Sequence, residues 1–298
     1  MGVAKSSSIE RHWNKLLILP TMIYLGIFAF GSFGLVLFLS FTNIAFRGEI
    51  SRFDIIGVEN YAKAIMDPTF LTALKNTFIL AGVAVPVEML LGLGIALMLN
   101  QDIKGRRILR SLFILPMITT PIVVGNMWRL MYNSEFGLIN YVLMSWGILS
   151  KPVPFLGLPE TALWAIILVD IWQWTPFTTL IILAGLQALP TAPYEAALVD
   201  GASSWQIFRK ITLPMLVPTL LIAFLLRFMD AIKIFDIVYI TTFGGPGLST
   251  EIVGLTIYKE AFKKLNLGYA SALTVLVLFI VIILSNIVLM IINKIMRR

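Results

Sequence analysis

The stretch LPTAPYEAALVDGASSWQIFRKITLP, residues 189–214, is the longest polar interruption expected on the cytoplasmic side of an otherwise apolar chain. Its first half predicts a short helix. Thr191 is placed to cap this helix, and Pro193 suits the opening turn, where its missing N–H costs nothing. Gly201 then ends it. An apolar face at the i, i+3, i+4 spacing is formed by Tyr194, Ala197 and Leu198.

The second half of the stretch predicts another short helix. Ser203 and Gln206 have the spacing of a capping box, and Pro214 is expected to close the segment. A second apolar stripe is formed by Trp205, Phe208 and Thr212. A helix pair this short and charged cannot cross a membrane, yet its apolar side needs burial. The pattern therefore indicates a surface that contacts a partner protein.

The composition of the whole chain is that of an integral membrane protein. Of its 298 residues 58% are hydrophobic and 13% charged, against roughly 45–50% and 25% in soluble domains. It has no cysteine, and its single histidine, His12, lies in a polar tail. The side chains that most often act in nucleophilic catalysis or bind zinc are therefore missing from the expected spans. No Gly-x-x-x-x-Gly-Lys-Ser/Thr phosphate loop occurs, so the chain is not expected to bind ATP itself.

Six apolar runs are each long enough to cross a hydrocarbon core of about 30 Å. They are expected at residues 16–40, 71–99, 111–131, 161–186, 215–240 and 269–292. The expected fold is all-α, with six transmembrane helices and a cytoplasmic loop at 189–214. The domain expected at 16–293 is flanked by tails at 1–15 and 294–298.

Basic residues orient the six spans. The side that holds both termini, the 100–110 turn and the 189–214 loop carries twelve Lys and Arg residues, whereas the opposite side carries seven. Positive loops stay in the cytoplasm, so both termini are expected inside the cell. This asymmetry also accounts for the net charge of +7 without nucleic acid as a partner.

Motifs along the chain resemble one family, the permease subunits of binding-protein-dependent ABC importers, in particular its maltose-permease-like sugar branch. Within the loop they are Glu195-Ala196-Ala197, Asp200-Gly201-Ala202 and Ile211-x-Leu213-Pro214. Elsewhere they are Gly57-Val58-Glu59-Asn60-Tyr61, Asn76-Thr77, Trp174-Thr175-Pro176-Phe177 and Gly244-Gly245-Pro246-Gly247. The resemblance runs from about residue 16 to the end of the chain.

The resemblance implies a role and a set of partners. The loop would dock into a cleft of a cytoplasmic ATPase subunit, with Glu195 and Gly201 at the signature positions. Two copies of that ATPase would bind ATP and Mg²⁺, and their closure would move the loop as a rigid lever. The other expected partners are a second homologous permease subunit, an extracellular sugar-binding protein and the lipid bilayer of the cell membrane. The cargo would be a di- or oligosaccharide.

The fourth span carries a polar and aromatic face suited to sugar. Asp170, Gln173, Trp174 and Phe177 follow the i, i+3, i+4, i+7 spacing of one helix face. Carboxylate and amide groups bind hydroxyls, and aromatic rings stack on C–H patches. Alignment on the loop within the resembled family adds Arg227 and Ala231 as pocket positions.

The fifth span carries charges of alternating sign, which default to functional hypotheses within a membrane. They are Arg227, Asp230, Lys233 and Asp236. Their spacing of three lets neighbours pair while the stripe winds around the helix. Arg227 and Asp230 are equally compatible with an ion-pair ladder and with substrate contact, whereas Lys233 and Asp236 favour the ladder.

Other polar residues within spans have open or structural interpretations. Glu88, after Pro86, suits either a hinge or an interior hydrogen-bond acceptor. Trp172 is expected to anchor at the interface if it faces lipid. An interfacial cap is favoured for Asn126, Trp128 and Arg129.

Alternative functions remain at this point. A glycerol phosphate importer of the same family would use Arg227 for its anion, although Asp170 and Asp230 oppose this. An ion-coupled secondary transporter would use Asp170 and Asp230 to titrate or to bind Na⁺, but would leave the 189–214 loop unexplained. A membrane enzyme lacks a recognisable catalytic set.

Overall fold

The computed structural model of the protein describes residues 8–47, 49–50, 54–102 and 104–296. The chain forms two compact units. The first comprises the residues up to Met66 together with Ile257–Val277, and the second comprises Asp67–Thr256 and the residues from Leu278 onward. Parts of the two expected tails, residues 1–7 and 297–298, lie outside the described residues.

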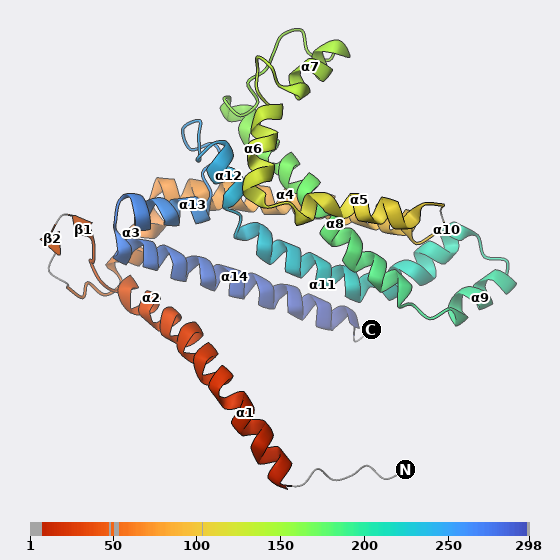
Figure 1. Ribbon diagram of the computed structural model, residues 1–298, viewed down its shortest axis with the longest axis horizontal. Coiled ribbons are helices and arrows are strands. Elements are labelled where there is room, and N and C mark those ends of the chain that lie inside the picture. The colour runs from red at the N-terminus through yellow and green to blue at the C-terminus, as the bar shows by residue number, and fades with distance from the viewer. Residues whose placement is uncertain (1–7, 48, 51–53, 103, 297–298) are drawn as a thin grey trace. The chain divides into compact units, whose positions relative to one another are not determined.

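The first unit begins with a long apolar helical segment. It consists of α1 (Ser8–Gly26), the π-helical turn η1 (Ile27–Gly31) and α2 (Ser32–Ser40) (Figure 1). Residues 17–40 are long and apolar enough to cross a membrane, and most of their side chains are exposed, although Ser40 at the end is buried. Leu17, Met22 and Phe30 are among the exposed side chains. The expected first span is therefore present as a helix whose surface suits lipid or another transmembrane helix.

The polar residues that follow tie this unit together through hydrogen bonds. Its remaining elements are β1 (Phe46–Arg47), β2 (Glu49–Ile50), α3 (Glu59–Met66), η3 (Lys259–Lys263) and the beginning of α14 (Leu267–Met296). The Asn60 Nδ2 donates to the carbonyls of Ser40 at 3.0 Å and Thr42 at 2.8 Å. The Gly268 amide donates to the Ile44 carbonyl at 3.0 Å. Buried backbone groups are thus satisfied where regular structure ends.

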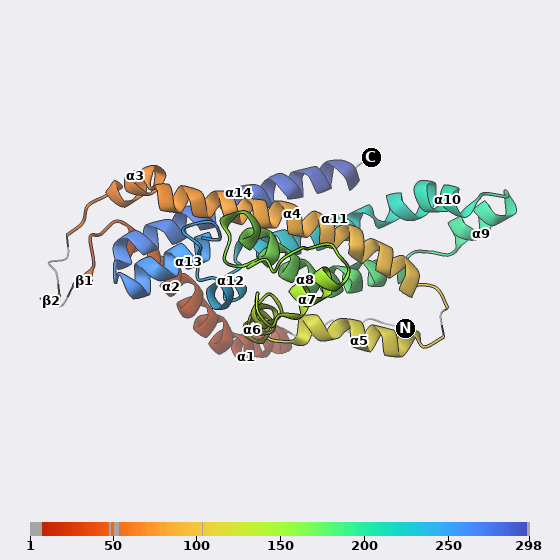
Figure 2. The same cartoon turned by 90° about the horizontal axis from the view of Figure 1, so that it is seen from above.

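The second unit is helical and contains the longest helices at its centre. Its elements are α4 (Pro68–Leu99), α5 (Arg106–Ile118), α6 (Pro121–Met131), α7 (Leu138–Ser145), α8 (Pro159–Gln187), α9 (Ala192–Val199), α10 (Ser204–Ile207), η2 (Phe208–Thr212), α11 (Leu213–Ile232), α12 (Asp236–Thr241) and most of α13 (Val253–Tyr258). Helices α4, α8 and α11 run side by side in Figures 1 and 2. In both views the α4–α5 turn and α9 and α10 lie at the same end.

Small residues let the central helices approach closely. A Cβ atom on Gly92 of α4 would lie 2.5 Å from Thr178 Oγ1 and 3.1 Å from the Thr179 backbone nitrogen of α8. A Cβ atom on Gly185 of α8 would lie 2.5 Å from Cγ2 of Thr219 in α11. Close contact through small residues drives helix association in lipid, where the hydrophobic effect between helices is lost. The central helices therefore depend on these two glycines.

We expect Gly92→Ala to lower the stability of the protein by about 1–3 kcal/mol, because the added methyl group overpacks the α4–α8 contact. Gly94→Ala is the matched control, since its Cβ would meet nothing within 4 Å on the same helix. The measurement is the thermal unfolding of both purified variants in detergent. Equal unfolding temperatures would contradict this account of the packing.

The third expected span is not a straight helix. Helices α5 and α6 meet at an angle of 93°, and Figure 1 shows α6 running across the direction of α5. Thr119 and Thr120 are extended, with ψ of 134° and 139°, and Pro121 opens α6. A proline removes an amide donor and pushes the residue before it out of the helical region. The expectation of one uninterrupted helix over 111–131 is therefore wrong.

The fifth expected span is also interrupted. Helix α11 ends at Ile232, and α12 begins only at Asp236. Helix α12 packs on α6, where Gly125 closely approaches Ile240 and the Arg129 Nη1 donates to the Ile240 carbonyl at 3.3 Å. Packing between these two short helices stabilises both breaks. The continuous helix expected over 215–240 is wrong at residues 233–235.

The fold class is nonetheless that of an all-α multi-pass membrane protein, apart from the two-residue strands of one hairpin. Among the described residues, five helices are long and apolar enough to cross a membrane, or six if the bent α5–α6 pair forms one span. The six-span count is compatible with this result. The placement of both termini in the cytoplasm stays a prediction.

Candidate functional site

Three charged side chains from three helices meet inside the second unit. Glu88 of α4, Asp170 of α8 and Arg227 of α11 are 0%, 1% and 1% exposed. The Arg227 Nε lies 2.7 Å from Glu88 Oε2, near enough for an ion pair although not aligned for a hydrogen bond. The Arg227 Nη2 donates to Glu88 Oε1 at 3.1 Å and to Asp170 Oδ2. Glu88 is therefore an interior partner of a buried charge, which resolves the choice left open by the sequence.

The charges continue along α11 toward its end. Asp230 is 48% exposed and lies 3.7 Å from Arg227 Nη1 and 3.9 Å from Lys233 Nζ. Because α11 ends before residue 233, Asp236 belongs to the next helix. Arg227, Asp230 and Lys233 thus form the expected ladder, and the part that would extend it to Asp236 on one helix is wrong.

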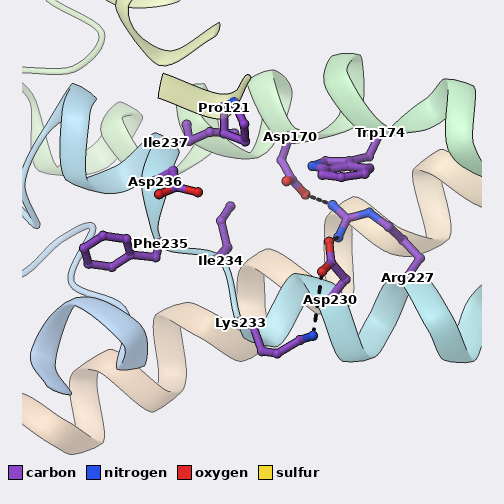
Figure 3. Close-up of a pocket in the computed structure, with 10 residues that line it drawn as sticks. All are labelled: Pro121, Asp170, Trp174, Arg227, Asp230, Lys233, Ile234, Phe235, Asp236 and Ile237. Atoms are coloured by element: carbon purple, nitrogen blue, oxygen red, sulfur yellow. Dashed lines mark hydrogen bonds and ion pairs between the residues drawn. The ribbon is translucent and has the colours of Figure 1, made fainter. Parts of the chain in front are cut away.

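A cavity of about 130 Å³ opens beside these charges, at the break between α11 and α12 (Figure 3). Its walls are formed by Pro121, Asp170, Trp174, Arg227, Asp230, Lys233, Ile234, Phe235, Asp236 and Ile237. A second cavity of about 290 Å³ shares several of these residues and is lined by Trp174, Phe177, Leu226, Arg227, Met229, Asp230 and Lys233. Together they offer aromatic, acidic and basic groups to a polar ligand.

Aromatic rings form one wall shared by the two cavities. The Arg227 guanidinium carbon lies 5.3 Å from the centroid of the Trp174 ring, within the range of a cation–π contact. Figure 3 shows this ring lying against the guanidinium. The Phe177 ring meets Trp174 edge to face, with centroids 6.1 Å apart.

Most of the expected pocket residues line these cavities, and two do not. Asp170, Trp174, Arg227 and Asp230 line the first cavity, and Phe177 lines the second. Ala231 is fully buried in packing. Gln173 is also buried, and its Nε2 donates to the Thr119 carbonyl at 3.2 Å, at the break between α5 and α6. Gln173 thus supports the break that shapes the cavity.

Several residues of this site are not predictable from their sequence neighbours. The sequence does not indicate that Glu88 pairs with Arg227, nor does it predict the cavity walls at the helix breaks, which are Pro121, Ile234, Phe235 and Ile237. Pro121 carried a signal, because a proline after two threonines marks a helix boundary. The 233–235 break has no such local mark.

The aromatic residues around α6 pack within the protein. Trp128 is buried, and its ring lies 5.6 Å from Trp172 and 5.5 Å from Tyr132, measured between centroids. Trp172 is 38% exposed, in agreement with a partly outward-facing residue. The interfacial role expected for Trp128 is therefore wrong, because the bend at Pro121 turns α6 onto α8 and α12.

The first helix of the 189–214 loop is α9. Pro193 lies in its first turn as expected, but the Thr191 side chain makes no capping hydrogen bond, since Thr191 itself has helical dihedral angles. Gly201 follows with φ of +71°, a left-handed conformation that glycine adopts without strain. Glu195, Ala196 and Asp200 are exposed, and so are Leu198 and Val199.

The second helix of the loop does not stand alone. Ser203 and Gln206 form the expected capping box, with the Ser203 amide donating to Gln206 Oε1 at 2.7 Å. From there the chain runs through α10 and the π-helical turn η2 directly into α11. The expectation that Pro214 closes the segment is wrong. Pro214 falls in the first turn of α11, and the wide turn before it accommodates the missing donor.

The comparisons with known proteins agree with this architecture. The family described as "Binding-protein-dependent transport system inner membrane component" matches residues 88–298. The chain is similar to the trehalose/maltose transport system permease protein MalF of Thermococcus litoralis, with 42% identity over 231 residues that cover 77% of this chain and 76% of the relative. It is similar to the trehalose transport system permease protein SugA of Mycobacterium tuberculosis, with 31% identity, covering 91% of this chain and 86% of the relative.

Among solved structures, the fold is similar to a chain of a bacterial ABC transporter involved in the import of the acidic polysaccharide alginate. The TM-score is 0.83 at 23% identity, covering 96% of this chain and 97% of that chain. This likeness concerns the fold alone. The sequence matches bear out the resemblance drawn from the loop motifs, and the chain belongs to the family of inner membrane components of binding-protein-dependent transport systems.

Proposed function

We propose that this chain is the permease subunit of an ATP-driven importer in the cell membrane whose cargo is a di- or oligosaccharide. Its family supports the transport role, and the similar trehalose and maltose permeases support sugar as the cargo. The observation that carries the proposal is the cavity at the helix breaks, where Trp174 and Phe177 stand beside Asp230. Aromatic faces with few convergent polar groups are typical of sites for polar organic ligands.

The exposed surface of the 189–214 loop indicates the first of the proposed partners. Exposed apolar side chains on a hydrophilic loop indicate a docking surface, and Leu198, Val199 and Trp205 are 66%, 89% and 67% exposed. We assign this surface to a cytoplasmic ATPase, present in two copies, which binds ATP and Mg²⁺. The residues assigned to coupling are Glu195, Ala196, Ala197, Asp200, Gly201 and Ala202.

Two further partners complete the proposed transporter. An extracellular binding protein delivers the sugar, as the family description implies. A second, homologous permease subunit supplies the other half of the pathway, and the apolar segment of α1 and α2, long enough to cross a membrane, is a candidate surface for contact with it. The ion-coupled alternative is less well supported, since Asp170 is already paired with Arg227.

The test is reconstitution of the chain with its ATPase, second permease and binding protein in vesicles. Maltose, trehalose and a panel of longer sugars should stimulate ATP hydrolysis and enter the vesicles. Transport by this chain alone, with no ATPase present, would contradict the proposal. A complete complex that responds to none of the sugars would also contradict it.

We expect Trp174→Ala to raise the sugar concentration that half-saturates transport by about twofold to tenfold, because an aromatic contact contributes about 0.5–1.5 kcal/mol. Trp172→Ala, two residues away on the same helix, is the matched control, since Trp172 lines neither cavity. Initial uptake rates at several sugar concentrations separate affinity from maximal rate. If Trp174→Ala matches its control, Trp174 does not bind the sugar.

A further inference from the structure

Arg227 lines both cavities, yet carboxylates already face its donors. The Nε lies 2.7 Å from Glu88 Oε2, the Nη2 donates to Glu88 and Asp170, and the Nη1 lies 3.7 Å from Asp230 Oδ2. With a side chain only 1% exposed, Arg227 offers little of its surface to the open space. An anion entering the cavity would have to compete with these carboxylates for it.

The same ion pairs fix the aromatic wall. The guanidinium is held from behind by Glu88, which lines neither cavity and lies on a different helix from both Trp174 and Arg227. The Trp174 ring rests against it with 5.3 Å between ring centroid and guanidinium carbon. An anchored cation beneath the ring stabilises the ring orientation. Glu88 therefore influences the cavity wall without touching its contents.

The formal charges around the cavity are predominantly negative. Asp170, Asp230 and Asp236 line it together with two cations, Arg227 and Lys233. With Glu88, which contacts Arg227 from outside the cavity, the group contains four carboxylates and two cations. Charges interact more strongly at short range inside a protein than in water. This environment disfavours anionic cargo and leaves hydroxyl groups as suitable partners for Asp230.

We propose that Glu88 is a positioning residue that makes the cavity selective for uncharged sugars: with Asp170 it withholds Arg227 from the cargo and holds it beneath Trp174. This inference rests on the proposed function in sugar transport. It adds that a carboxylate outside the cavity determines the charge of the accepted cargo.

The experiment measures equilibrium binding of labelled maltose and of a uronic acid disaccharide to the purified permease–ATPase complex, without binding protein. The wild-type complex is expected to bind maltose at least about tenfold more tightly than the acidic disaccharide. In Glu88→Gln, Arg227 loses a charged partner and becomes available to an anion. The acidic disaccharide should then gain about tenfold in affinity, while maltose loses severalfold because Trp174 is held less firmly.

Two variants separate positioning from a purely structural role. Glu88→Asp keeps the charge and should retain the wild-type preference. Glu260→Gln removes a mostly buried carboxylate far along the sequence, paired with Lys264 at 2.5 Å, and should leave the preference unchanged. A structural role would lower the amount of folded complex without changing the ratio of the two affinities.

Either of two results would overturn this inference and leave the proposed sugar function unaffected. One is equal binding of the two disaccharides by the wild-type complex, which remains decisive even if Glu88→Gln does not assemble. The other is a folded Glu88→Gln complex whose affinity ratio stays within twofold of wild type. Binding of neither disaccharide by the wild type would instead overturn the proposed sugar function, and this inference with it.

Discussion

Replacing Arg227 with methionine is expected to destabilise the protein by about 3–5 kcal/mol, because Glu88 and Asp170 would remain buried without their cationic partner. Both carboxylates are at most 1% exposed, so water cannot replace the guanidinium. In thermal unfolding of the purified protein, the expected decrease is on the order of 10 °C. The amount of protein recovered from membranes should fall with it.

Asp230→Asn is the matched control for this prediction. It removes a charge from the same ladder, but Asp230 is 48% exposed, and exposed ion pairs contribute only about 0–1 kcal/mol. Arg227→Lys should fall between the two, since an ammonium group keeps the charge but loses the planar fork. An Arg227→Met protein as stable as Asp230→Asn would show that the buried ion pairs do not hold the three helices together.

Gly201→Val is expected to reduce sugar uptake at least about tenfold while the protein still inserts and its ATPase still hydrolyses ATP. Gly201 has φ of +71°, and a left-handed conformation costs a residue with a Cβ atom about 1–2 kcal/mol. A Cβ atom would meet nothing within 4 Å, so the effect comes from backbone strain. The strained turn would shift α9 relative to α10 and disturb the proposed docking surface.

The control is Gly105→Val, at a turn with φ of +83° whose Cβ would likewise meet nothing within 4 Å. It introduces comparable strain at the same end of the second unit but outside the 189–214 loop. Uptake and ATP hydrolysis are measured in parallel in reconstituted vesicles. If Gly105→Val reduces uptake as much as Gly201→Val, or if Gly201→Val transports normally, the coupling role fails.

Local features of the sequence predicted the structure well where neighbouring residues decide the outcome. The apolar runs at 71–99 and 161–186 became α4 and α8 nearly to their ends. The capping box at Ser203 formed because both of its partners lie within one turn. The i, i+3, i+4 pattern likewise brought Asp170 and Trp174 to one cavity.

Features that depend on distant contacts could not be predicted in this way. Glu88 and Arg227 are 139 residues apart, and no periodicity links them. The break before Asp236 follows from packing of α12 on α6, which in turn depends on the bend at Pro121. Pro214 does not end the helix because the π-helical turn before it, which the sequence does not mark, lets the helix continue.

The two interrupted helices also have a consequence for the barrier that the cargo must cross. A hydrocarbon layer does not tolerate peptide groups without hydrogen-bond partners, and the protein supplies partners to several of those at the breaks. The Thr119 amide donates to the Leu115 carbonyl and the Lys233 amide donates to the Asp230 carbonyl. The Gln173 Nε2 donates to the Thr119 carbonyl. The first break lies only about 20 Å along α5 from the basic turn. Because the protein supplies these partners, the first break can lie within the bilayer without water to satisfy its peptide groups.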